Sequence, residues 1–180
     1  MFIMRKYEML GFFIISLISI GLALLFWALP SSYFLDGIRP TTDSLWQIGK
    51  LMFFSIAIYT IIEYYIFGRE FENFIFAKAA TLFIAPLIYI GASYILDVGL
   101  GAATVNNHIV TYALAVFVGQ YVSFYILRDG YYFKLMNGYA VIGILLMITI
   151  FITYGSTTDK FNSHIFQPME RYKTSIKNLQ

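Results

Sequence analysis

The sequence predicts an all-α, polytopic membrane protein in which five transmembrane helices form a compact bundle. Two features of the composition indicate this class: 59% of the 180 residues are hydrophobic and only 12% are charged, whereas a soluble domain is about one quarter Asp, Glu, Lys and Arg. The third observation is that the apolar residues form five runs of roughly 20, the length with which an α-helix crosses a bilayer.

The five predicted spans are residues 9–29, 45–67, 74–96, 109–127 and 135–154, followed by a polar tail, residues 155–180. The first run contains no charge and is longer than the apolar part of a signal peptide, so we expect it to be retained as a helix. The connections are too short for a soluble domain. Residues 1–180 are therefore predicted to form a single integral membrane domain.

Composition also excludes several functions. The chain has no cysteine and a net charge of only +2, which excludes disulfides, thiolate chemistry and thiolate metal sites and gives no basic patch for nucleic acid. No catalytic or phosphate-binding motif is present. We expect no cofactor and no nucleic-acid partner; the predicted surroundings are the lipid bilayer.

Orientation is predicted from the positively charged residues near the span ends, which favour the cytoplasmic side. With a cytoplasmic N-terminus, the inner side holds Arg5, Lys6, Arg69, Arg128 and Lys134, whereas the outer loops hold only Arg39 before the tail. We therefore expect a bacterial plasma-membrane protein that crosses the membrane several times, with the N-terminus in the cytoplasm and the C-terminus outside the cell.

Small residues line one face of the fourth span at four-residue spacing: Thr111, Ala115, Gly119 and Ser123. Such stripes allow close approach of another helix. We interpret this one as packing inside the bundle, with a homodimer face as the alternative.

Two ionisable residues, Glu63 and Lys78, lie on either side of the short predicted inner loop, each about one turn inside its span. They are predicted to be neighbours. A charge within a span is a functional hypothesis by default, but residues this near an interface also form structural pairs or extend to the headgroups. We expect a structural pair or extension to the headgroups, with a proton or ion pathway as the alternative.

The entry to the second span, Thr41 to Lys50, carries Ser44-Leu45-Trp46-Gln47, the pattern of a helix capping box. Trp46 is predicted to anchor at the interface and Lys50 to extend toward the outer headgroups. Asp43, Trp46, Gln47 and Lys50 are also candidate ligand-binding residues.

The stretch from Pro40 to Tyr64 resembles a family of small bacterial multi-pass membrane proteins of unknown function, whose pattern runs P-x-N-E-S-x-W-E-H-x-K before a span ending I-E-Y. The resemblance extends to Ala77-Lys78-Ala79 and more loosely to His164, Phe166 and Pro168. It implies a multi-pass membrane protein and no particular activity. Thr42-Asp43 and Gln47-Ile48 replace the N-E and E-H pairs of the family.

Both histidines, His108 and His164, are predicted at the outer face together with Asp43 and Glu170. These four complete the candidate ligand-binding residues, but their spacing matches no metal-binding motif, so we predict no metal site. An odd number of spans brings the tail to the same side as the loop from Pro30 to Ser44. The tail is therefore predicted to fold back onto the outer helix ends, with Phe161 and Phe166 against Trp46.

Three hypotheses of function follow. The first is a non-enzymatic membrane protein that binds a small molecule or lipid, or serves as an accessory subunit of a membrane complex. The second is a transport component, such as a substrate-binding membrane subunit, suggested by Glu63, Lys78 and Gln120 and by Pro86, which hints at a helix break. The third is a membrane enzyme with an outer-face polar or metal site.

Overall fold

The computed structural model describes residues 2–30, 32–128, 136–155 and 165–167. These residues form the all-α bundle that the sequence predicts. The helices are α1 (Phe2–Ala28), α2 (Tyr33–Ile38), α3 (Leu45–Ile66), α4 (Phe74–Tyr94), α5 (Val105–Arg128) and α6 (Asn137–Gly155), with a 3₁₀ turn η1 (Gly68–Glu70) and a π-helical turn η2 (Ile95–Gly99). Five of the described helices are long and apolar enough to span a membrane.

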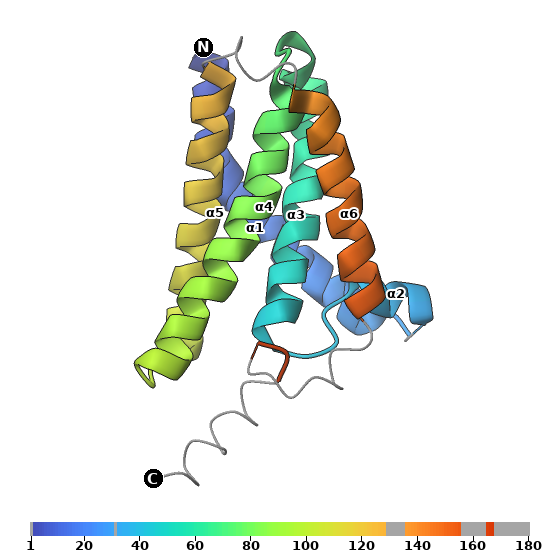
Figure 1. Ribbon diagram of the computed structural model, residues 1–180, viewed down its shortest axis with the longest axis vertical. Helices are drawn as coiled ribbons and strands as arrows, with labels where there is room; N and C mark the ends of the chain where they lie inside the picture. The colour runs from blue at the N-terminus through green and yellow to red at the C-terminus, as the bar shows by residue number, and fades with distance from the viewer. Residues whose placement is uncertain (1, 31, 129–135, 156–164, 168–180) are drawn as a thin grey trace, which may run out of the picture.

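The five long helices run up and down along one bundle axis (Figure 1). The start of α1, the end of α3, the start of α4, the end of α5 and the start of α6 lie at one end, here called the N-terminal end. The other end, here called the opposite end, carries α2 and η2. Helix α4 packs against α3, α5 and α6, while α1 packs against α3 and α5.

The observed helices extend beyond the predicted spans at three places. Helix α1 begins at Phe2 instead of residue 9, so that Glu8 belongs to it. Helix α5 begins at Val105 instead of residue 109, which puts His108 in its first turn. The third predicted span continues from α4 through η2 to Gly99. Polar residues at helix ends obscured these boundaries because hydropathy alone does not detect a polar helical turn.

Helix α2 was not predicted and lies within the expected loop from Pro30 to Ser44. Ser32 is its N-cap, with an Oγ that accepts a hydrogen bond from the Leu35 backbone N–H at 3.3 Å. The helix packs against α6 at the opposite end of the bundle (Figure 1). Six residues are too few to show a periodic pattern, which explains why the sequence analysis missed it.

The sequence hint of a helix break at Pro86 was wrong. Helix α4 is continuous on both sides of this residue, which fits the tolerance of membrane helices for proline when neighbouring helices support the freed carbonyl. The irregular turn lies further on, where α4 passes into η2.

Helices α4 and α5 approach closely along the small-residue stripe. Thr111, Ala115, Gly119 and Ser123 are all buried. A Cβ atom at Gly119 would lie 3.0 Å from Thr81 Cγ2 and 3.1 Å from Ala85 Cβ. The Thr81 hydroxyl donates to the Gly119 carbonyl at 2.9 Å. This face of α5 is therefore occupied by α4, as the packing interpretation expects and the homodimer interpretation does not.

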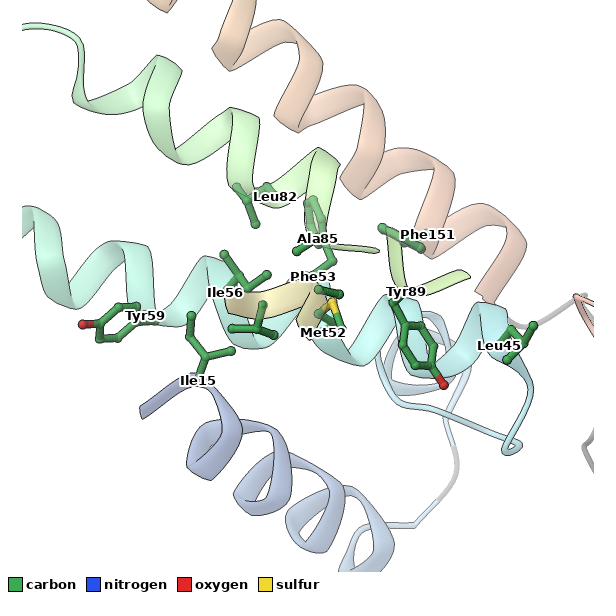
Figure 2. Packing of buried hydrophobic residues seen from close by; sticks show 12 residues of the cluster. Ile15, Leu45, Met52, Phe53, Ile56, Tyr59, Leu82, Ala85, Tyr89 and Phe151 are labelled. Carbon is green, nitrogen blue, oxygen red and sulfur yellow. The ribbon is translucent and has the colours of Figure 1, made fainter. Parts of the chain in front are cut away.

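The interior combines an apolar centre with polar groups toward both ends. Figure 2 shows Tyr59 and Tyr89 on either side of the central residues Ile56, Met52 and Phe53. Large apolar side chains such as Trp27 and Leu17 face outward, which is the arrangement that lipid favours. Buried ionisable residues are Glu8, Lys50, Glu63, Lys78, Asp97 and His108.

Candidate functional site

Three charged side chains from three helices meet at the N-terminal end of the bundle. The Lys78 ammonium lies 2.6 Å from Glu8 Oε1 and 2.7 Å from Glu63 Oε2. None of the three side chains is more than 2% exposed. We call Glu8, Glu63 and Lys78 the acid–lysine cluster.

Polar neighbours surround the cluster. The Ser123 hydroxyl of α5 donates to Glu8 Oε1 at 2.9 Å, so that four helices contribute to the site. The Tyr59 side chain interacts with Glu63, and the Tyr59 hydroxyl donates to the Tyr7 carbonyl at 2.8 Å. These contacts hold the carboxylates in place without adding any charge.

Local structure explains how the cluster forms. Glu63 lies in the last turn of α3 and Lys78 in the second turn of α4, and the tight turn η1 joins the two helices. A Cβ atom at Gly68 would come within 2.8 Å of the Phe74 ring, so a residue without a side chain is needed at this close approach. The Asn73 side chain then donates to the Ile126 carbonyl, which fixes the start of α4 against α5.

The charge of the cluster is unbalanced. With all three groups ionised it carries −1, and one added proton makes it neutral. Burial of net charge in a medium of low dielectric constant is costly. In addition, Glu8 Oε2 and Glu63 Oε1 accept no hydrogen bond from the described residues. Such an arrangement can accept and release one proton, or hold one further cation.

Full burial corrects one part of the sequence interpretation. The prediction that Glu63 and Lys78 are neighbours agrees with their contact, but extension to the headgroups does not. A side chain that extends to the headgroups keeps its charged end in water, whereas Lys78 is 1% exposed. Lys78 instead turns inward between two carboxylates.

Lys50 also departs from the prediction. Its side chain is completely buried, and Nζ donates to the Asp36 carbonyl of α2 at 3.3 Å. It therefore lies beneath α2 rather than among the outer headgroups.

Gln47 is buried beside Lys50 in the first turn of α3, where its Nε2 donates to the Thr41 hydroxyl at 3.1 Å. Ser44 is the N-cap of α3, as the capping-box pattern predicts.

Trp46 contacts the tail. Its backbone N–H donates to the Ile165 carbonyl at 3.1 Å, and its ring centroid lies 5.4 Å from that of Phe166. The contact with Phe166 agrees with the predicted folding back of the tail. The other predicted contact residue, Phe161, lies outside the described part of the chain.

The four residues proposed for an outer-face site are only partly described. His108 lies at the opposite end, where its Nε2 is 3.2 Å from Asp97 Oδ1, and Asp43 precedes α3 at the same end. His164 and Glu170 fall outside the described residues. Within those residues, no group of three or more His, Asp or Glu side chains has a geometry suited to a metal ion.

Sequence reasoning missed two members of the buried polar groups. Glu8 was assigned to a cytoplasmic N-terminal segment because it precedes the uncharged run, and Asp97 was assigned to a loop. A helical-face analysis extended beyond the apolar runs could have found Glu8, since Glu8, Ile15 and Ser19 follow one another at the seven- and four-residue spacing of one helix face.

No protein-family model, no curated protein and no solved structure matches this chain. The site is therefore interpreted from its own geometry.

Proposed function

We propose that the protein is a proton-translocating component of a membrane transport system, with the acid–lysine cluster as its proton-binding site. The observation that carries this proposal is that two fully buried carboxylates share one ammonium. Such a cluster changes between charges of −1 and 0 when a single proton binds. Ionisable groups inside a membrane bundle are the usual components of proton pathways.

The position of the cluster supports the proposal. Its members belong to α1, α3 and α4, and Ser123 adds α5, so a change of charge acts on four helices at once. A purely structural role would be met by one acid and one base, because a second buried acid adds cost without a second cation. The additional carboxylate favours a site that exchanges protons.

Proton flux into liposomes tests this function. Purified protein is reconstituted in vesicles that contain a pH-sensitive dye, and a potassium diffusion potential drives protons inward. The wild type is expected to raise the initial rate several-fold above protein-free vesicles. Glu63→Gln and Glu8→Gln are each expected to remove most of the increase, because each variant lacks one of the two carboxylates that share the proton.

The matched control is Glu70→Gln. Glu70 is exposed at the same end of the bundle, and its substitution makes the same chemical change outside the cluster, so the flux should stay at the wild-type rate. Equal rates for wild type and empty vesicles would contradict the proposed function.

A second candidate function is lipid binding, which one observation favours. A cleft of about 300 Å³ is lined by Ala23, Phe26, Trp27, Arg39, Pro40 and Thr41, so it combines apolar side chains with a cation. Arg39 itself pairs with Asp36 at 2.6 Å. Native mass spectrometry after incubation with phosphatidylglycerol tests this function: Arg39→Gln should retain less lipid than wild type, and Arg69→Gln, at the other end of the bundle, should retain the same amount.

Three further expectations stand as proposals. We infer that the protein lies in a bacterial plasma membrane with its N-terminus in the cytoplasm, which the distribution of positive charge near the helix ends supports. We also infer that it belongs to the family that the stretch from Pro40 to Tyr64 resembles. Other subunits of a membrane complex are the proposed partners. The outer-face enzyme stays a hypothesis because it depends on His164 and Glu170.

A further inference from the structure

A second titratable group lies at the opposite end of the same helices. His108 in the first turn of α5 places Nε2 3.2 Å from Asp97 Oδ1 and Nδ1 3.5 Å from the Tyr89 hydroxyl. All three side chains are buried. Both ring nitrogens of the imidazole therefore face a polar partner, which is the arrangement that a proton-transferring histidine needs.

The backbone at this group is unusual. Asp97 lies in η2, a π-helical turn that continues α4, and such turns are frequent at functional sites. The titratable side chains that face His108 are Asp97 from η2 and Tyr89 from α4, and Asp43, which precedes α3, acts electrostatically on Tyr89. The imidazole of His108 thus lies between a carboxylate and a phenol.

Aromatic and hydroxyl side chains lie between this histidine and the middle of the bundle. The rings of Tyr89 and Tyr112 are in edge contact, with centroids 5.9 Å apart. The Tyr112 hydroxyl shares a hydrogen bond with Ser19 of α1 and interacts with the Ser55 side chain of α3. Helices α1, α3, α4 and α5 all contribute to this central set.

From the centre, one face of α3 leads to the acid–lysine cluster. Ser55, Tyr59 and Glu63 are four residues apart, so each step is one helical turn, about 6 Å. Tyr59 is 1% exposed. Since direct hydrogen bonds do not cover a full turn, the step from Ser55 to Tyr59 requires a water molecule.

A buried amide beside this step has unused hydrogen-bonding capacity. Gln120 is 3% exposed, and neither its Oε1 nor its Nε2 has a hydrogen-bond partner among the described residues. It lies close to Tyr59, since a Cβ atom at Gly11 would touch both side chains, at 2.8 Å and 3.0 Å. An unpartnered amide inside an apolar bundle is a suitable partner for the required water.

We propose that His108, Asp97 and Tyr89 form a second proton-exchange site, connected to the acid–lysine cluster through Tyr112, Ser19, Ser55 and Tyr59. This inference rests on the proposed function, since it supplies the other end of the proton pathway. A proton leaves the imidazolium of His108, each hydroxyl and each bridging water accepts one proton as it donates another, and a carboxylate of the cluster takes up the last. No electron is transferred.

The test uses the vesicle assay with variants of this second site. Tyr89→Phe keeps the ring and removes only the hydroxyl that faces His108, and it is expected to lower the protein-dependent proton flux at least tenfold. His108→Gln should have the same effect. Tyr121→Phe removes a tyrosine hydroxyl from the outward face of α5, where Tyr121 is 61% exposed, and should leave the flux unchanged.

The thermal unfolding midpoint of each variant is measured alongside the flux, and Tyr89→Phe, which removes one atom, remains informative if His108→Gln does not fold. Wild-type flux in both variants, together with loss of flux in Glu63→Gln, would overturn this inference and leave the proposed function intact. Absence of protein-dependent flux in the wild type would overturn the proposed function itself.

Discussion

At the scale of single residues, Lys78 determines whether the interior tolerates two buried acids. Its ammonium is the cation within 2.7 Å of both Glu8 and Glu63. Loss of one partner from a buried ion pair costs on the order of 3–5 kcal/mol because the remaining charge is left uncompensated. The three residues should therefore respond unequally to substitution.

Lys78→Met is predicted to be the most destabilising single change in the cluster, by about 3–5 kcal/mol, because it leaves two carboxyl groups without a cation. Glu63→Gln should be much milder, since Glu8 and Lys78 then form a neutral pair. Thermal unfolding in detergent measures both effects. Addition of Glu8→Gln and Glu63→Gln to Lys78→Met should restore much of the lost stability.

This rescue separates charge compensation from simple packing. If the triple variant is less stable than Lys78→Met alone, the cluster is held together by shape and not by charge balance. Glu70→Gln, at an exposed position, serves as the reference for a glutamate substitution and should leave the midpoint where it is.

At the scale of secondary-structure elements, the close packing of α4 against α5 fixes the geometry between Lys78 and Ser123. Gly119 is a point of close approach to Thr81 and Ala85 of α4, so a larger side chain there must push the helices apart. Overpacking of a well-filled interior costs about 1–3 kcal/mol. The two helices also carry Tyr89, His108 and Tyr112, which makes both polar groups sensitive to this spacing.

Gly119→Val is therefore predicted to destabilise the protein by about 1–3 kcal/mol. It should lower the proton flux together with the stability. Gly91→Ala is the matched control: Gly91 belongs to α4, but a Cβ atom there has nothing within 4 Å. The control should unfold at or slightly above the wild-type temperature, because Ala favours helix over Gly. A stable Gly119→Val would contradict the observed packing.

The tail segment Ile165–Gln167 is a second element whose packing can be tested. Truncation after Ser156 removes the Ile165 hydrogen bond and the Phe166 ring contact with Trp46, and it should lower the unfolding temperature by several degrees. Phe166→Ala should give part of that loss. If neither variant changes stability or flux, the tail does not support the entry to α3.

At the scale of the whole molecule, the sequence was sufficient to predict five helices and a contact between Glu63 and Lys78, because long apolar runs and charges beside a short loop constrain both. It was insufficient for Glu8, Asp97 and Lys50. Glu8 meets Lys78 from a helix 70 residues away, whereas Asp97 and Lys50 contact the next and the preceding helix. In each case one sequence without aligned relatives does not tell which helix faces meet. Hydropathy identifies spans, but it does not identify which polar side chains face inward.

Membrane topology follows from the same whole-molecule arrangement. Thr104 and Ser32 lie at the opposite end of the bundle and are exposed, and the natural chain has no cysteine. Single cysteines at Ser32, Thr104 and Ser175 should react with an impermeant maleimide in intact cells. A cysteine at Glu70 should react only after the cells are opened. The reverse pattern would invert the proposed orientation.

In the proposed function, the acid–lysine cluster carries one exchangeable proton. Infrared difference spectroscopy of the reconstituted protein during a pH titration measures it directly, because a protonated carboxyl group has a C=O stretch that shifts in heavy water. We expect such a band in the wild type, its loss in Glu63→Gln and Glu8→Gln, and its presence in Glu70→Gln. Absence of the band across the titration in wild-type protein, or its persistence in both cluster variants, would contradict a shared proton in the cluster.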